Sequence, residues 1–186
     1  AEVIHGLFKM KGPVDSVRMV TLYMGDEGLM PLVLENGHIR VDIANVQMKA
    51  EGTPLNDKLY EFIDKRNALE LAIEEVDRKE ARMALDDIHD QLQQESDSLV
   101  GAMNTYLKQF IADNYENVLG PSVFMMMCSA LPYPVMTPNI EAILKDAPAS
   151  FKDNVLVKDY VSKAKENMKL IEEHKRLQQN VAATRP

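Results

Sequence analysis

The sequence predicts an α+β fold, in which an N-terminal antiparallel β-sheet (partial sandwich or barrel-like) precedes a helical region of about five helices. Two observations lead to this prediction. Short segments rich in β-branched residues occupy roughly the first fifty positions, and after Gly52 the apolar residues recur at helical spacing. We therefore divide the 186 residues into an antiparallel β segment (1–52), a helical region packed on it (53–178) and a polar linker or tail (179–186).

Five short segments of the β region are predicted to be strands. They are residues 3–10, 17–24, 31–35, 38–43 and 46–51. The clearest local signal is the pair Asn36 and Gly37, which lies between two apolar runs. Both residues tolerate the positive φ of a type I′ turn, whose twist matches that of the flanking strands. The pattern therefore predicts a hairpin across this pair.

The first helix is predicted to begin at Thr53 and Pro54. The hydroxyl of Thr53 can cap a helix, and Pro54 suits the first helical position because its missing N–H costs nothing there. Neither glycine nor proline occurs in residues 55–100. One unbroken helix over residues 57–95 would be ~60 Å long, more than the width of a domain of this size. We therefore expect this run to bend, to split or to project as an arm.

Capping residues and prolines predict the later helices. One would start in the cluster 95–98 and end near Ala112, one would run from Pro121 to before Pro132, one would follow Thr137 and Pro138 to about Lys145, and the last would begin near Asp153.

Composition excludes several classes of function. The net charge of −8 and the pI near 5.0 argue against nucleic-acid binding and against docking on an anionic membrane. No stretch approaches the ~18 continuous apolar residues of a membrane-spanning helix, so direct membrane insertion is not expected. The single cysteine, Cys128, excludes an internal disulfide, a CxxC centre and a thiolate zinc cluster.

Pairs of acidic residues and scattered histidines are the first candidates for catalysis or metal binding. The acidic pairs are Glu74–Glu75, Asp86–Asp87 and Glu172–Glu173, and the histidines are His5, His38, His89 and His174. The acidic pairs lie among basic residues at helical spacing, which favours solvated charged faces. The histidines form no HxH, HxxxH or HExxH spacing, so no metal site is predicted.

The run Met125, Met126, Met127 and Cys128 is the most unusual feature of the helical region. Thioethers and a thiolate suit Cu(I), but four consecutive helical positions point in four directions. Methionine also fills irregular gaps in cores, so buried packing is the favoured interpretation. An apolar setting would raise the pKa of Cys128, which argues against a nucleophile. The sequence thus predicts no catalytic, cofactor-binding or metal-binding residue.

Four segments together resemble a known domain. They are residues 1–12, similar to a G-x-F-x-F-x-G strand; residues 31–39, similar to an E-x-G-x-I hairpin; residues 51–59, similar to a G-T-x-x-N strand-to-helix junction; and residues 110–120, similar to a helix junction ending in glycine. In this order they resemble a Bacteroidetes domain of unknown function. That domain lies N-terminal to thioredoxin-like (thiol:disulfide interchange) domains of the TlpA/ResA type.

The resemblance implies a cell-envelope or periplasmic protein, in that family often lipid-anchored through an N-terminal cysteine. It also implies one or two strands before the first matched strand and a thioredoxin-like domain with a CxxC after Pro186. The strand-like start and polar end of this chain agree, and we expect it to be part of a longer protein. No catalytic residue carries over, because the redox cysteines would lie in the following domain.

The leading hypothesis is therefore a non-catalytic accessory or interaction module of an envelope thiol-disulfide oxidoreductase. Its partners would be its own C-terminal thioredoxin-like domain or envelope client proteins, and it could dimerise through its helices. The alternative is a small-molecule or peptide binding domain, in which the open edge of the β segment takes a ligand or an added strand. A hydrolase or isomerase is disfavoured, because no spacing suggests a nucleophile and its base.

Overall fold

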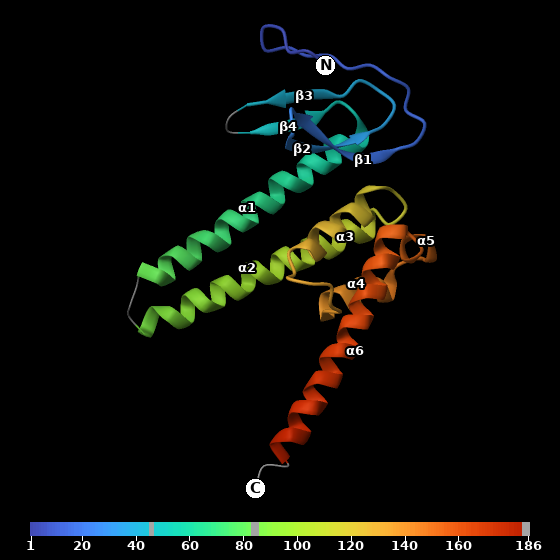
Figure 1. The fold of residues 1–186 in the computed structure, drawn as a ribbon. Helices are drawn as coiled ribbons and strands as arrows, with labels where there is room; N and C mark the ends of the chain where they lie inside the picture. Colours follow the sequence, from blue (N-terminus) through green and yellow to red (C-terminus); the bar gives the residue numbers. More distant parts are fainter. Residues whose placement is uncertain (45–46, 83–85, 184–186) are drawn as a thin grey trace. The chain divides into compact units, whose positions relative to one another are not determined.

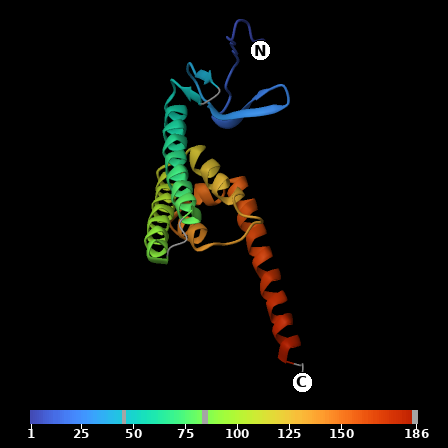
Figure 2. The same ribbon diagram turned by 90° about the vertical axis from the view of Figure 1, so that its left-hand side faces the viewer.

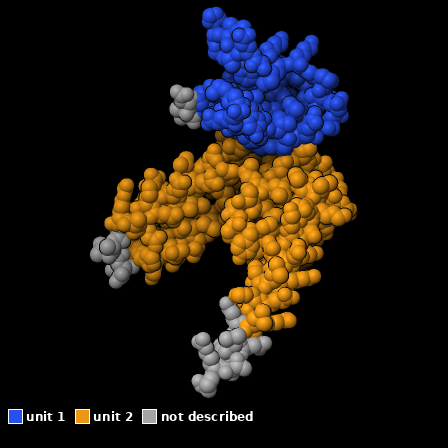
Figure 3. All heavy atoms as spheres, viewed as in Figure 1, with its two compact units in different colours: residues 1–61 blue, residues 62–186 orange. Residues whose placement is uncertain are grey.

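The structure is a computed structural model that describes residues 1–44, 47–82 and 86–183. It contains two compact units, residues 1–61 and residues 62–186, coloured blue and orange in Figure 3. The first unit holds the strands and the start of the first helix, and the second unit holds the remaining helical structure. The predicted α+β class is confirmed, since strands precede helices along the chain (Figure 1).

The first unit contains two small antiparallel sheets, each of two strands. β1 (Arg18–Met24) pairs with β2 (Glu27–Leu34), and β3 (Arg40–Ile43) pairs with β4 (Met48–Glu51). These strands overlap four of the five predicted segments, although Val46, the first residue of the predicted 46–51 strand, lies outside the described residues.

The hairpin predicted at Asn36 and Gly37 is wrong. The β1–β2 hairpin turns instead at Gly25, whose φ of 62° suits a tight two-residue connection. The segment after β2 forms a bend, and β3 pairs with β4 rather than with β2. Gly37 has a φ of 142°, and a Cβ there would lie 2.8 Å from Cγ2 of Thr53. This segment is therefore packed against the start of the first helix, which prevents a local turn.

The N-terminus of α1 (Pro54–Arg82) holds this segment in place. Oε1 of Glu35 accepts hydrogen bonds from the backbone N–H groups of Leu55 and Asn56, at 2.8 and 3.1 Å. A carboxylate is favourable there, because the first N–H groups of a helix lack partners and carry partial positive charge. The predicted start at Pro54 is confirmed, but the hydroxyl of Thr53 accepts from the side chain of Asn56, at 2.8 Å, rather than from the backbone.

Asn56 is fully buried and closes the outer edge of β2. Its Oδ1 accepts from the N–H of Val33 and its Nδ2 donates to the carbonyl of Val33, both at 2.8 Å. The hydroxyl of Tyr60 donates to the carbonyl of Pro31, also at 2.8 Å. Since proline has no N–H to satisfy, these side chains complete the hydrogen bonding of the outward-facing backbone of β2 at residues 31 and 33.

The strand predicted at residues 3–10 is also wrong. The segment contains a tight turn in which Ile4 and Leu7 exchange two backbone hydrogen bonds, at 2.9 and 3.0 Å. His5 and Gly6 in the turn have φ values of 52° and 78°. Ile4 and Leu7 are 59% and 76% exposed, and within the described ranges this segment pairs with no named strand. Alternating apolar residues require a neighbouring strand to become a sheet, and here none covers them.

The long helical run splits into α1 and α2 (Asp86–Asp113). A helix start at residues 95–98 is wrong, because α2 runs through that cluster without interruption. Within the second unit the two helices lie side by side in both ribbon views (Figures 1 and 2). Phe62 of α1 packs on Tyr106 and Phe110 of α2, with ring centroids 5.6 and 4.3 Å apart. The split allows the apolar faces to bury each other, which a single 57–95 helix could not do.

A second buried asparagine forms the junction between α2 and α3 (Leu119–Ser129). Nδ2 of Asn114 donates to the carbonyl of Phe110 at 2.7 Å, and its Oδ1 accepts from Asn117 at 2.9 Å. The Oδ1 of Asn117 in turn accepts from the N–H of Leu119 at 2.8 Å. A Cβ at Gly120 would clash with the carbonyl oxygen of Asn114, so the close approach of the two helix ends requires glycine there.

The later helices are α4 (Pro138–Asp146), α5 (Ala149–Lys152) and α6 (Val155–Ala183). Thr137 caps α4 as predicted, by accepting from the N–H of Ile140 at 3.3 Å. The single-turn α5 was not predicted, and it brings the total to six helices in the described part of the chain. Residues 179–183, which we had assigned to a tail, continue α6.

The apolar centre of the second unit is aromatic. Phe124 of α3 meets Phe151 of α5 and Tyr160 of α6 edge to face, at centroid distances of 5.6 and 5.9 Å. Phe124 and Phe151 are fully buried. Such contacts add to the free energy gained by removing the rings from water, and they join three separate helices.

Replacing Asn56 by alanine tests the closure of β2. We expect Asn56→Ala to lower the free energy of unfolding by roughly 2–4 kcal/mol, because the buried N–H and C=O of Val33 would lose their partners. Equilibrium urea denaturation measures the change. Glu61→Ala, at an exposed position of the same helix, is the matched control and should stay within about 0.5 kcal/mol of the parent. Equal effects of the two substitutions would contradict the role assigned to Asn56.

Candidate functional site

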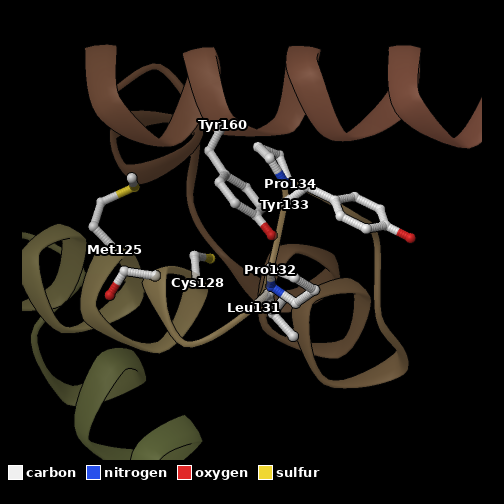
Figure 4. A pocket seen from close by; sticks show the side chains of 8 residues that line it. Met125, Cys128, Leu131, Pro132, Tyr133, Pro134 and Tyr160 are labelled. Atoms are coloured by element: carbon white, nitrogen blue, oxygen red, sulfur yellow. The ribbon is translucent and has the colours of Figure 1, made fainter.

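A small hollow of about 230 Å³ lies between α3, α6 and the segment that joins α3 to α4. Its lining is mostly apolar and includes Met125, Cys128, Leu131, Pro132, Pro134 and Tyr160. Figure 4 shows Cys128 on α3 and Tyr160 on α6 pointing toward one another, whereas Tyr133 points away and is 52% exposed. The hollow is thus a candidate site for a small apolar group rather than for a charged substrate.

Hydrogen bonds from α6 hold the joining segment in place. The hydroxyl of Tyr160 donates to the carbonyl of Val135 at 3.0 Å and accepts from its N–H at 3.3 Å. Nδ2 of Asn167 donates to the carbonyl of Pro134 at 2.8 Å. Burial raises the pKa of Tyr160, so its hydroxyl stays protonated and available as a donor. These groups are occupied in positioning the chain and do not converge on a reacting atom.

The thiol of Cys128 is unreactive by its surroundings. The residue is 3% exposed. Burial raises the pKa of the Cys128 thiol to about 11, and the hydroxyl of Tyr160 offsets this only in part. The thiolate is the nucleophilic form, and its fraction at neutral pH is therefore very small. The direction of the pKa shift agrees with that expected from the sequence.

The neighbouring methionines do not converge with Cys128. Sδ of Met126 accepts a hydrogen bond from Nη1 of Arg66 on α1 at 3.0 Å, whereas Met125 lines the hollow beside α6. Their sulfurs therefore serve different contacts, as consecutive helical positions predict. In the part of the chain that the structure describes, no group of three or more His, Cys, Asp or Glu residues could hold a metal ion.

The acidic pairs lie on exposed helical faces. Glu74, Glu75, Glu172 and Glu173 are all exposed. Glu75 forms an ion pair with Arg78 at 3.0 Å. The side chains of Asp86 and Asp87 lie outside the described residues. The interpretation as solvated charged faces is confirmed for the pairs on α1 and α6.

The histidines are exposed and scattered. His5 and His38 lie in the first unit, and His89 and His174 in the second. Nδ1 of His89 lies 2.8 Å from Oε1 of Glu80, across the α1–α2 hairpin. This contact orients one imidazole at the surface. A catalytic pair would also need a nucleophile within hydrogen-bonding distance of the imidazole, and the described residues place none there.

The outer edge of β1 is a second candidate site, for an extended peptide. Thr21 pairs with Pro31, whose carbonyl points away from β1 toward Tyr60. In an antiparallel pair, the backbone groups of two directly opposite residues either both point toward the partner strand or both point away from it. Because the carbonyl of Pro31 points away, the N–H and C=O of Thr21 also face outward from the sheet. Along the strand, Tyr23 and Met24 are 62% and 60% exposed. This edge therefore offers backbone hydrogen bonds with apolar side chains beside them.

Sequence reasoning missed Asn56, Asn114 and the hollow. The available signal was an asparagine close to a helix end, since a short amide can bond to nearby backbone groups. The positions of Cys128 and Tyr160 on apolar helical stripes indicated burial, but nothing local indicated that the two side chains meet.

Residues 1–59 match a family model described as "Domain of unknown function (DUF4369)". This match includes β1 to β4 and the beginning of α1. No curated protein and no solved structure matches the chain. None of the helices described here is long and apolar enough to cross a membrane.

Alkylation kinetics test the state of Cys128. We expect iodoacetamide to modify the folded chain at neutral pH at least about 100-fold more slowly than the urea-unfolded chain, because the pKa of the thiol lies near 11 instead of 9.0 and the side chain is covered. Mass spectrometry of the Cys128 peptide gives both rates, and Cys128→Ser provides the blank. Similar rates in the two states would show that the thiol is accessible and that its pKa is not raised by the fold.

Proposed function

We propose that this chain is a non-catalytic accessory module of a thiol-disulfide oxidoreductase in the cell envelope of Bacteroidetes. In this proposal it positions, or restricts access to, a thioredoxin-like domain that follows it, or brings two such domains together. The observation that carries the proposal is the match of residues 1–59 to a domain of unknown function. The resemblance of residues 1–12, 31–39, 51–59 and 110–120 to a domain that precedes thioredoxin-like domains supports it. Envelope clients or a second copy of the chain are the further partners.

The chemistry of the described residues supports an accessory role. Dithiol exchange needs a reactive thiolate and a second cysteine, whereas this chain has one cysteine, and its thiol is buried with a raised pKa. In this proposal the exchange reaction belongs to the thioredoxin-like domain and not to this chain. A unit of packed helices suits a spacer, because packed helices hold their length better than a flexible linker does.

A comparison of large and small substrates tests this proposal. The full reading frame is expressed with and without residues 1–186, and the reduction of a folded protein disulfide is compared with the reduction of a small-molecule disulfide. If the module controls access, its removal should change the rate on the protein substrate and leave the rate on the small one unchanged. A variant with both CxxC cysteines replaced by serine is the control for background activity.

Either of two results would overturn the proposal: a reading frame without a CxxC domain, or equal effects of removal on both substrates. Light scattering on the full-length protein with and without the module decides between positioning and dimerisation.

The second candidate function is capture of an extended peptide by the outer edge of β1. The specific observation in its favour is the difference between the two edges of the β1–β2 sheet. The outer edge of β2 is closed by Asn56, Pro31 and Tyr60, while that of β1 presents the outward backbone of Thr21 and carries only one charged residue, Arg18. Edges that proteins keep unpaired are normally protected by prolines, bulges or several charges. The pairing of β1 with β2 is irregular between Leu22 and Tyr23, so the proposed binding edge is the regular stretch around Thr21.

A proline substitution tests strand addition. Peptides are selected from a displayed random library on the immobilised chain, and their affinities are measured for the parent and two variants. Thr21→Pro removes an outward N–H while leaving the bonds to β2, and we expect it to weaken peptide binding by about tenfold or more. Thr21→Ala is the matched control and should bind as the parent does. Absence of any selected peptide, or equal binding by both variants, would contradict this function.

A further inference from the structure

The exposed bend after β2 contains a dipeptide that is chemically labile. Asn36 and Gly37 are both exposed, and they lie outside the two sheets. Asn36 is the one asparagine of the full sequence that precedes a glycine. Glycine lacks a side chain that would hinder attack by its own backbone nitrogen, so an asparagine before it can react when the backbone is accessible.

The fold itself requires the glycine at this position. Gly37 has a φ of 142°, and an added Cβ would lie 2.8 Å from Cγ2 of Thr53. A larger residue after Asn36 would therefore be both strained and crowded. The packing between the bend and the start of α1 thus imposes the glycine, which is the half of the pair that makes Asn36 labile.

Three other asparagines are held in ways that oppose the reaction. The amides of Asn56 and Asn114 are buried and hydrogen-bonded to the backbone, and Asn167 is bonded to Pro134 within a helix. Helical and buried amides cannot reach their own following nitrogen without breaking these bonds. Asn36 has no such restraint among the interactions of the described residues.

We propose that Asn36 is a site of spontaneous deamidation. The deprotonated backbone nitrogen of Gly37 attacks Cγ of Asn36, an N–Cγ bond forms, and the Cγ–Nδ2 bond breaks. Nδ2 leaves as ammonia with the proton it gains from solvent, and a succinimide remains. Water then opens the ring at one of its two carbonyls and gives an aspartyl or an isoaspartyl product. The net change replaces an amide by a carboxylic acid, with no oxidant or reductant.

The position of the site links this change to the fold. Asn36 follows Glu35, whose carboxylate caps α1. Two positions after Asn36 comes His38, whose carbonyl oxygen would lie 2.7 Å from a Cβ at Gly52. The new negative charge adjoins the capping carboxylate, and the isoaspartyl product lengthens the main chain inside a close-packed bend. Both products should loosen the attachment of β2 to α1, and the isoaspartyl form should loosen it more.

Ageing of the whole chain tests the proposal. The folded protein, the urea-unfolded protein and Asn36→Gln are incubated side by side at neutral and mildly alkaline pH, and their peptides are resolved by chromatography and mass spectrometry. We expect progressive loss of the intact Asn36 peptide in the folded protein, faster at the higher pH, without loss of the Asn56 and Asn114 peptides. The aged protein should also unfold at a lower temperature than Asn36→Gln aged in parallel.

The unfolded sample makes the result decisive. If Asn36 is modified in the unfolded chain but stays intact in the folded one, the fold protects it and the proposal is overturned. Modification of Asn36 with an unchanged unfolding temperature would overturn the link to the α1 attachment.

Discussion

The closure of the outer edge of β2 by Asn56 is the interaction on which the first unit depends. A buried backbone N–H or C=O without a partner is costly, and a strand at the edge of a two-stranded sheet has several. A single amide side chain satisfies both groups of Val33, and the carboxylate of Glu35 satisfies the first N–H groups of α1. The helix thus supplies hydrogen-bond partners for the edge of β2, and the end of β2 supplies partners for the first N–H groups of the helix. Without the other element, each would bury backbone groups that lack a partner.

These hydrogen bonds between β2 and α1 also explain the difference between the two edges of the β1–β2 sheet. The start of α1 closes the outer edge of β2, whereas the backbone of Thr21 faces outward on the opposite edge, that of β1. In the second unit, Asn114 repeats the same principle at the α2–α3 junction, where Gly120 permits the close approach. The one thiol of the chain, that of Cys128, is buried against Tyr160, and the acidic pairs on α1 and α6 face solvent.

Sequence patterns succeeded where a local rule suffices. The α+β order, the helix starts at Pro54 and Pro138 and the buried setting of Cys128 follow from capping, proline geometry and helical periodicity. They failed where a local preference competes with a distant contact. Asn36 and Gly37 favour a type I′ turn in isolation. In the structure Glu35 binds the start of α1, Gly37 lies close to Thr53, and β3 pairs with β4.

By itself, then, the sequence determined the order of strands before helices, the helix starts at Pro54 and Pro138 and, through its single cysteine, the absence of an internal disulfide. These properties depend on residue identity or on neighbours within a few positions along the chain. Only the tertiary structure decided the pairing of the strands, the split of the long helical run and the meeting of Cys128 with Tyr160. Each of these depends on contacts between residues tens of positions apart, where buried polar groups find partners and apolar faces find cover.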